Sequence, residues 1–587
     1  MLKLLKNLNK RDYIYVFISA GLIVFQVWLE LKMPDYMSNI TQLVQTRGAS
    51  INDILREGSY MLLCAFGSLV SAFIVGYFTS TIAASFSYRT RGKLFRKVED
   101  ISTFEIKKFS PSSLITRTTN DITQIEFLIA MGLTLMIKAP ITAVWAVTKI
   151  LNKNIEWSIL TGVAVLVLLI TIGIIMMIVM PKFKIVQELM DKINMVMREN
   201  LSGIRVVRAF NAEKYQEDKF ENVNNTLTNQ QVFNQKAFNF LSPVMYLVMY
   251  FLTLGIYFIG AMLINEANMG DKIVLFGNMI VFSSYAMQVI MSFLMLAMIF
   301  MMLPRASVSA KRINEVLDTP ISVKEGNVTM NNSDIKGCVE FKNVSFKYPD
   351  ADEYVLEDIS FKVNKGETIA FIGSTGSGKS TLINLIPRFY DATSGEILIN
   401  GIDVRDYSFE YLNNIIGYVP QKATLFSGDI LSNVSFGKNS DGKPSNKKIA
   451  DALRVSQASE FVSKLEDGEK SHIAQGGTNV SGGQKQRLSI ARTIARNPEI
   501  YIFDDSFSAL DYKTDSTLRR ELREYTKDAT VMIVAQRIGT ILNADKIVVL
   551  DNGKCVGVGT HNELMKKCKV YKEIALSQVS KEELENV

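Results

Sequence analysis

The sequence is poor in residues that build disulfide frameworks or structural metal sites. Its 587 residues include only four cysteines and two histidines. The cysteines form no C-x-x-C pair, and no histidine lies at ligand spacing from them, so the pattern indicates neither a disulfide framework nor a zinc site. The four cysteines are Cys64, Cys338, Cys555 and Cys568.

A strong excess of one charge is also missing. The net charge is +7, and much of the basic excess lies in loops beside apolar runs. That placement suits the cytoplasmic face of a membrane better than a nucleic acid, so we expect no nucleic-acid partner.

Long uncharged runs are absent from the second half of the chain. Hydrophobic residues make up 48% and charged residues 21% of the sequence, so the two kinds must be segregated. Between Lys10 and about Leu303, apolar runs alternate with basic loops, whereas after Lys311 no uncharged run approaches the length that crosses a bilayer. The N-terminus resembles a signal peptide but has no small-residue cleavage site, so we expect a retained first helix.

Six apolar segments are long enough to span a membrane as helices of about 20 residues. The two connections at 87–126 and 181–237 are long and rich in Lys and Arg, whereas the other three hold few basic residues. The positive-inside rule therefore places these two loops and both termini in the cytoplasm. The expected spans are 13–31, 60–86, 127–148, 157–180, 238–264 and 273–303.

The two cytoplasmic loops show helical apolar spacing, which predicts that the spans continue as helices into the cytosol. Segments 110–116 and 211–220 are candidate contacts with a soluble domain, and the alternative is that both are solvated loops. Lys138 is a charge inside the third span, which by default suggests a function. Because it lies beside Pro140 in the expected inner half, we predict instead that it snorkels to the inner interface.

The last two spans are rich in aromatic residues and methionine, which adapt to varied apolar ligands. Ordinary helix packing is the alternative for each of these residues. The group includes Tyr246, Tyr250, Phe251, Tyr257, Phe258, Phe276, Phe282, Tyr285, Phe293, Met279, Met287, Met291, Met295 and Met298.

The second half reads as a separate α/β domain. A polar, Asn-rich stretch at 319–337 is typical of a linker, and short β-rich runs then alternate with helical patterns, which predicts a sheet with a substantial parallel part. We therefore expect a six-helix transmembrane domain at 1–318, a linker at 319–337, a P-loop ATPase domain at 338–577 and a C-terminal tail at 578–587.

One motif gives this domain its chemistry. The residues from Gly373 to Ser380 fit G-x-x-x-x-G-K-[ST] between an apolar strand and a helix, as a phosphate-binding loop requires. Backbone N–H groups would converge on ATP phosphates, Lys379 would supply a charge, and Ser380 would bind Mg²⁺ together with Asp504, which ends a second apolar strand. The expected nucleotide-binding residues here are Gly373, Ser374, Thr375, Gly376, Ser377, Gly378, Lys379, Ser380 and Thr381.

Further segments, in this order along the chain, make the soluble half resemble an ABC ATPase and the whole chain an exporter-type ABC half-transporter. They are Tyr348, Gln421, the VSGGQ segment at 480–484, Asp504 and the SALD segment at 508–511.

The resemblance implies a role for each of these positions. Tyr348 would stack on adenine, Gln421 would sense Mg²⁺ and the γ-phosphate, and Asp511 would couple two ATP sites. The signature would contact ATP held by a partner chain, through its hydroxyl and N–H groups at the start of a helix. The signature residues are Ser481, Gly482, Gly483 and Gln484.

Two positions depart from the family pattern. Asp505 stands where Glu is usual, and Gln536 stands where a switch His is usual. The shorter Asp side chain would leave its carboxylate about 1.5 Å from the place of the general base, which can slow hydrolysis about 10²- to 10⁴-fold. Gln536 donates a hydrogen bond but cannot become an imidazolium. The chain thus resembles the degenerate-site subunit of heterodimeric bacterial multidrug exporters.

The resemblance implies a function and a location. We expect ATP-driven export of hydrophobic or amphipathic compounds across the cell membrane, by a heterodimer with a second half-transporter, in contact with membrane lipid. The alternatives are a lipid or peptide exporter, or a subunit that binds ATP to gate or regulate without transport of its own. ATP and Mg²⁺ are the expected cofactors, and the ATPase domain is expected in the cytoplasm.

Overall fold

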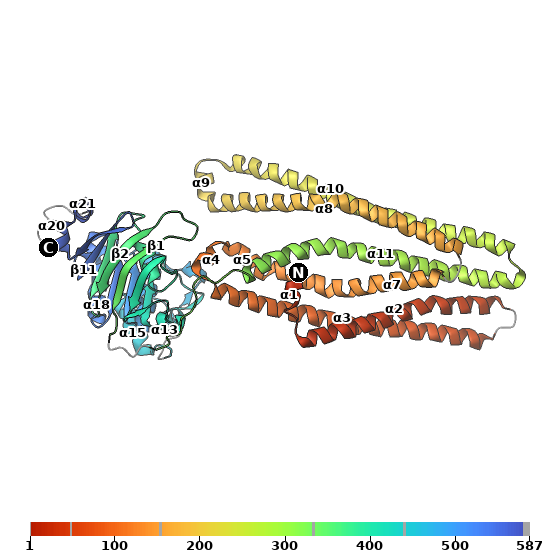
Figure 1. The fold of residues 1–587 in the computed structure, drawn as a ribbon, viewed down its shortest axis with the longest axis horizontal. Coiled ribbons are helices and arrows are strands. Elements are labelled where there is room, and N and C mark those ends of the chain that lie inside the picture. The colour runs from red at the N-terminus through yellow and green to blue at the C-terminus, as the bar shows by residue number, and fades with distance from the viewer. Residues whose placement is uncertain (1, 47–49, 152–154, 331–334, 438–441, 579–587) are drawn as a thin grey trace. The chain divides into compact units, whose positions relative to one another are not determined.

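The computed structural model describes residues 2–46, 50–151, 155–330, 335–437 and 442–578. Its contacts divide the chain into two compact units. A membrane unit comprises Met1–Glu99 and Pro111–Asp318, and an ATPase unit comprises Asp100–Ser110 and Thr319–Val587 (Figure 1). Of the expected tail at 578–587, only Gln578 is described, and it ends a helix, α21 (Lys569–Gln578). The proposed domain limits stay predictions.

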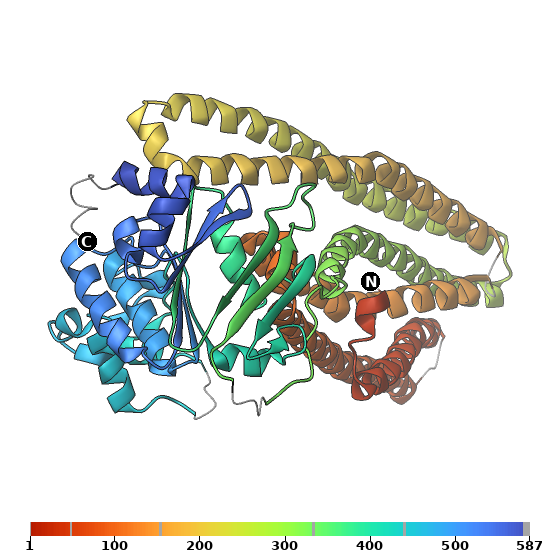
Figure 2. The ribbon, with the colours of Figure 1, turned by 60° about the vertical axis from the view of Figure 1, so that its left-hand side comes forward.

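The membrane unit is entirely helical. Within the described residues, six helices are long and apolar enough to cross a membrane, as expected from the sequence. The third is a row of four shorter helical segments, and a hairpin of two long helices joined by a short one runs along one side (Figures 1 and 2). The helices are α1 (Leu2–Leu5), α2 (Lys10–Gln45), α3 (Ile51–Asp100), α5 (Pro111–Thr118), α6 (Asn120–Phe127), η1 (Leu128–Gly132), α7 (Leu133–Leu151), α8 (Ile155–Ser202), α9 (Ile204–Ala209), α10 (Glu213–Glu266) and α11 (Met269–Leu317).

The apolar core of the membrane unit lies where α2, α3, α7, α8, α10 and α11 meet. Trp157 is buried there with its ring centroid 5.2 Å from that of Phe282. Phe282 and Tyr285 are both fully buried. For these two residues the structure favours the alternative of ordinary helix packing, because neighbouring helices bury their rings. Met291, by contrast, is exposed.

The structure gives Lys138 an acidic partner that the sequence analysis did not predict. Its Nζ lies 2.8 Å from Oε1 of Glu30 on α2. A second pair joins the same two helices, since Lys149 Nζ of α7 lies 2.7 Å from Oδ2 of Asp35 on α2. Glu30 lies near the end of the expected span 13–31. Lys138 therefore pairs with a counter-charge on the neighbouring helix α2, instead of extending alone toward the inner interface.

A ten-stranded sheet forms the centre of the ATPase unit, in the order β5-β4-β1-β2-β12-β11-β3-β10-β9-β6, and β7 pairs with β8 apart from it. The neighbours from β11 to β6 all run parallel, as the buried runs predicted. The strands are β1 (Val339–Phe346), β2 (Leu356–Val363), β3 (Thr368–Gly373), β4 (Ser394–Ile399), β5 (Ile402–Asp403), β6 (Ile416–Val419), β7 (Gly428–Asp429), β8 (His472–Ile473), β9 (Ile500–Asp504), β10 (Thr530–Val534), β11 (Lys546–Asp551) and β12 (Lys554–Gly559).

Helices cover the sheet, and two apolar cores result. Because side chains alternate along a strand, Ala370 and Ile372 of β3 join one core, and Ile369 and Phe371 join the other. The helices are α4 (Thr103–Lys107), α12 (Lys379–Leu385), α13 (Phe409–Ile415), α14 (Ile430–Val434), α15 (Asn446–Val455), α16 (Ser459–Val462), η2 (Gly468–Lys470), η3 (Gln475–Gly477), α17 (Gly482–Arg496), α18 (Tyr512–Tyr525), α19 (Ile538–Ile541), α20 (His561–Lys567) and α21 (Lys569–Gln578).

One loop between membrane helices belongs to the ATPase unit. The segment Asp100–Ser110, which contains α4, groups with that unit, and Phe104 packs against the core that contains Phe371. The first expected contact segment, 110–116, shares only Ser110 with this segment, and the rest of it belongs to the membrane unit. The second, 211–220, stays a prediction.

Candidate nucleotide-binding site

The predicted phosphate loop connects β3 to α12 at the carboxyl edge of the parallel strands. Gly376 and Gly378 have φ of +86° and +93°, a region that side chains with a Cβ adopt only with strain. A Cβ added to Gly373 would lie 2.1 Å from the carbonyl oxygen of Leu550. The glycines of the motif are thus required by the path of the backbone.

Lys379 folds back over this loop. Its Nζ donates to the carbonyl oxygens of Gly373 (2.9 Å) and Ser374 (2.7 Å). Burial lowers the pKa of this ammonium group. An anion in the loop would offset that desolvation, so the lysine is placed to exchange carbonyl contacts for phosphate oxygens.

The two expected Mg²⁺ ligands meet although they are far apart in the sequence. Ser380 Oγ donates to Asp504 Oδ1 over 2.9 Å, because both residues follow the carboxyl ends of parallel strands. Burial raises the pKa of the Asp504 carboxyl group. A hydroxyl and a carboxylate beside a phosphate loop fit Mg²⁺, which takes few protein ligands and keeps water and phosphate oxygens.

Asp505, Gln421 and Gln536 form a second cluster. Oδ2 of Asp505 accepts hydrogen bonds from Nε2 of Gln536 (2.8 Å) and Nε2 of Gln421 (3.2 Å). Asp505 also has φ of +46°, a region that Asp enters more readily than most residues. Burial raises the pKa of its carboxyl group. One carboxylate oxygen at the expected base position is thus held by two amide groups.

Tyr348 lies in the loop after β1. Its hydroxyl is 3.1 Å from Thr381 Oγ1, and its ring stands edge-on to those of Phe346 and Tyr390. Lys107 from α4 donates to the hydroxyl of Tyr390 over 3.0 Å. The expected adenine-stacking residue therefore lies next to the phosphate-loop helix and near the loop 100–110.

The signature residues start α17. The N–H of Gln484 donates to Ser481 Oγ (3.3 Å), and the N–H of Ser481 donates to Gln484 Oε1 (2.8 Å), which forms a capping box. No atom lies within 4 Å of a Cβ added to Gly482. Asp511 caps α18 by accepting from the N–H of Thr514 over 3.0 Å.

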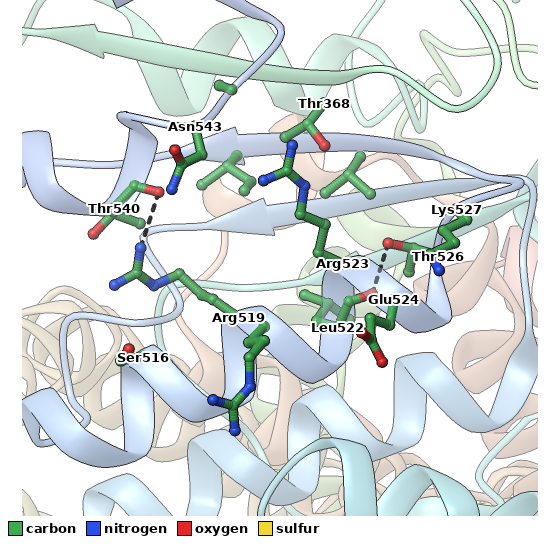
Figure 3. Close-up of a pocket in the computed structure, with 14 residues that line it drawn as sticks. Thr368, Ser516, Arg519, Leu522, Arg523, Glu524, Thr526, Lys527, Thr540 and Asn543 are labelled. Carbon is green, nitrogen blue, oxygen red and sulfur yellow. Dashed lines mark hydrogen bonds between the residues drawn. The ribbon is translucent and has the colours of Figure 1, made fainter. Parts of the chain in front are cut away.

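Sequence reasoning missed some residues of this region. Tyr418 on β6 donates to Asn384 Oδ1 over 3.0 Å, and its hydroxyl is near the carboxyl group of Asp504. Its place beside Ile502 on the next parallel strand was the signal that could have found it. A cavity of about 480 Å³ between α18, α19 and the sheet (Figure 3) contains none of the expected nucleotide-binding residues.

Comparisons with known proteins agree with this architecture. Residues 15–303 match the family model of the ABC transporter transmembrane region, and residues 356–508 match the family model described as ABC transporter. An uncharacterized ABC transporter ATP-binding protein of Mycobacterium tuberculosis is 40% identical over 92% of this chain and 93% of its own length. The putative multidrug export ATP-binding/permease protein YgaD of Bacillus subtilis is 31% identical over 85% of this chain and 84% of its own length.

Two further comparisons concern a flippase and a solved structure. An ATP-dependent lipid A-core flippase of Pseudomonas fluorescens is 31% identical over 86% of this chain and 82% of its own length. The structure of a bacterial Atm1-family ABC exporter with ATP bound superimposes with a TM-score of 0.82 over 97% of this chain and 100% of the other, at 22% identity. That likeness shows the fold.

Fold and site together define a multi-pass membrane protein with a cytoplasmic ATPase domain. The chain belongs to the ABC transporter family, whose members are ATP-hydrolysing translocases, and it is an exporter of that family.

Proposed function

We propose that this chain exports hydrophobic or amphipathic compounds, driven by ATP, as one half of a heterodimer. The observation that carries the ATP part is the meeting of Ser380 with Asp504 beside the phosphate loop. The names of two relatives, a multidrug exporter and a lipid A-core flippase, support an apolar or amphipathic substrate.

Each residue of the site has a part in this proposal. Backbone N–H groups of the phosphate loop and Lys379 bind the phosphates. The ring of Tyr348 stacks on adenine once the hydrogen bond between its hydroxyl and Thr381 Oγ1 is broken. Ser380, Asp504 and Gln421 hold Mg²⁺, which would neutralise charge on the phosphates. The signature residues Ser481 to Gln484 contact ATP that is bound to the partner chain.

The cluster around Asp505 supports slow hydrolysis at this chain's own site. A general base needs a free oxygen near the attacking water, and Oδ2 of Asp505 already accepts two amide donors. Gln536 adds no charge that could replace the usual imidazolium.

Symmetry then favours a heterodimer. In a homodimer both composite sites would contain Asp505 and Gln536, and both would hydrolyse slowly. A partner with Glu and His at these positions would form one competent site with the signature of this chain.

Mutagenesis of the full assembly tests this asymmetry. Gly482→Asp adds a carboxylate at the start of α17 and should lower ATPase activity by about 100-fold or more, because it repels the partner-bound phosphates. Gly482→Ala is the matched control, since space around that Cβ is open. Asp505→Ala should cost much less. Equal loss from Gly482→Asp and Asp505→Ala, or full activity of this chain alone, would overturn the asymmetric assembly.

A cavity in the membrane unit supports an amphipathic substrate. It has a volume of about 450 Å³ and lies between α6, α8, α10 and α11, where Phe127, Phe238 and Met302 mark the cytoplasmic ends of the expected spans. Asn234 is 7% exposed there, and its Oδ1 has no hydrogen-bond partner. Arg305 lies over the ring of Phe183 at 5.9 Å. Rings, amides and one cation suit an apolar molecule with a polar or anionic head.

Transport assays test both the direction and this substrate class. Inverted membrane vesicles should take up a fluorescent amphipathic dye in the presence of ATP, and Arg305→Ala should weaken uptake of anionic dyes more than of neutral ones. Val308→Ala, an exposed change elsewhere on α11 and outside the candidate aromatic and methionine group, is the control. Passive flux that does not depend on ATP would favour the gating role instead.

A further inference from the structure

Two side chains outside every motif hold the loop that carries Gln536. This switch loop, residues 535–541, leaves β10 and enters α19. Gln578, at the end of α21, donates from Nε2 to the carbonyl oxygen of Gln536 (2.7 Å) and accepts on Oε1 from the N–H of Ile538 (2.8 Å). One amide side chain therefore pairs with two backbone groups of the loop, as a neighbouring strand would.

Arg519 of α18 holds the far end of the same loop. Its Nη1 donates to the carbonyl oxygens of Gly539 (2.9 Å) and Thr540 (3.4 Å), and the side chain reaches toward Thr540 along the cavity wall in Figure 3. Asp515 fixes the guanidinium with two bonds, Nε to Oδ1 (3.0 Å) and Nη2 to Oδ2 (2.9 Å). Asp515 is 6% exposed, so the carboxylate of the pair is shielded from solvent, while Arg519 is partly exposed.

These contacts link the loop to both neighbouring elements of the site. Asp515 follows Asp511, the cap of α18, by one helical turn, and its N–H donates to the carbonyl oxygen of Asp511 over 2.9 Å. At the near end of the loop, Gln536 donates to Asp505. The geometry of the Gln536 amide toward Asp505 thus depends on a backbone that is held from two sides, by α18 and by α21.

We propose that Gln578 and Arg519 are positioning residues of the ATP site, which keep Gln536 directed at Asp505. The C-terminal helix α21 then becomes part of the nucleotide site, although it contains none of the family motifs. The inference rests on the proposed binding of ATP at the phosphate loop.

Gln578 offers the sharper test because its side chain is exposed and its removal leaves no buried charge. Gln578→Met keeps the length of the side chain and removes both hydrogen bonds. Gln578→Glu keeps the acceptor for the N–H of Ile538 but turns a carboxylate oxygen toward the carbonyl oxygen of Gln536. Ser577→Ala is the matched control, since Ser577 Oγ donates only within its own helix, to Ile574.

The readout must report this chain's own site in the complete assembly in membranes. Photolabelling of this chain with 8-azido-ATP at 4 °C measures binding, and the label that remains after a chase with unlabelled Mg·ATP at 37 °C measures retention. Gln578→Met should leave binding within about twofold and speed the loss of nucleotide about tenfold, because two hydrogen bonds that orient Gln536 are gone. Gln578→Glu should be at least as severe.

A double-mutant cycle separates positioning from general stability. If Gln578 acts through the Gln536 side chain, then Gln536→Ala with Gln578→Met should lose nucleotide no faster than Gln536→Ala alone. Additive effects, unchanged retention in Gln578→Met, or an equal change in Ser577→Ala would overturn the inference. Absence of labelling in the unmodified chain would instead contradict the proposed ATP site, so the two failures are distinguishable.

Discussion

Two ion pairs with the same distance lie in different surroundings in the two units. Lys138 and Glu30 in the membrane unit are 2.8 Å apart, with side chains 18% and 24% exposed. Arg454 and Glu521 in the ATPase unit are also 2.8 Å apart, with side chains 59% and 30% exposed. Lipid cannot solvate a charge that loses its partner, whereas water can. The two pairs therefore have the same N–O distance, but loss of one partner should cost more free energy of unfolding in the membrane unit than in the ATPase unit.

The membrane pair also belongs to a larger polar group. Oε1 of Glu30 accepts from Gln26 (2.9 Å) and Ser68 (3.2 Å) as well as from Lys138. Such a group is self-contained, because its donors come from α2, α3 and α7. Among the described residues, no further side chain hydrogen-bonds the side chain of Arg454 or of Glu521, so loss of this surface pair should have a small and local effect on stability.

Loss of one charge of the membrane pair should give the largest effect. Lys138→Met leaves Glu30 without its cation and should destabilise the membrane unit by about 3 kcal/mol, which lowers its melting temperature by about 5–10 °C. Tryptophan fluorescence is the suitable measurement, since all three tryptophans, Trp28, Trp145 and Trp157, lie in this unit. An unchanged melting temperature would mean that the pair is solvated.

Removal of both charges should be less harmful than removal of one. Glu30→Gln combined with Lys138→Met leaves no uncompensated charge, and its cost should fall to about 1 kcal/mol. The same fluorescence measurement applies to this double variant. If the two single effects simply add, then each residue acts through other contacts and the ion pair is not the unit of stability.

Sequence could predict the phosphate loop because its eight residues are contiguous. The meeting of Ser380 with Asp504 was also predictable, since Ser380 follows the phosphate loop after β3 and Asp504 ends β9, so both lie at the carboxyl edge of the parallel strands. The partner of Lys138 was not, because it depends on which face α7 turns toward α2. The contact between Gln578 and Gln536 could not be predicted either, since the two residues are 42 positions apart and Gln578 belongs to no motif. Contacts set by helix rotation or by long-range packing leave no local pattern in the sequence.

Tyr285→Phe should give an intermediate effect. Its buried hydroxyl lies 2.9 Å from the carbonyl oxygen of Leu31 and 2.7 Å from Oδ1 of Asp35. Removal of the hydroxyl leaves these two oxygen acceptors with one donor fewer, and it should lower the free energy of unfolding by about 1–2 kcal/mol. Tryptophan fluorescence again reports the melting, because Trp157 belongs to the same core. Phe276→Leu, a change to a half-buried ring on the same helix, controls for altered packing, and an equal shift from both would argue against a role for the hydroxyl.

The surface pair of the ATPase unit should give the smallest effect. Arg454→Ala and Glu521→Ala each expose one partner to water, so a double-mutant cycle should yield a coupling of about 0.2–1 kcal/mol. A thiol-reactive dye can follow this unit, since Cys338, Cys555 and Cys568 lie in it. The coupling should shrink further in 1 M salt, where charges are screened beyond about 3 Å. The membrane pair should keep its coupling under the same conditions, because ions do not enter the lipid. A surface coupling above about 2 kcal/mol that salt does not reduce would contradict the contrast between the two units.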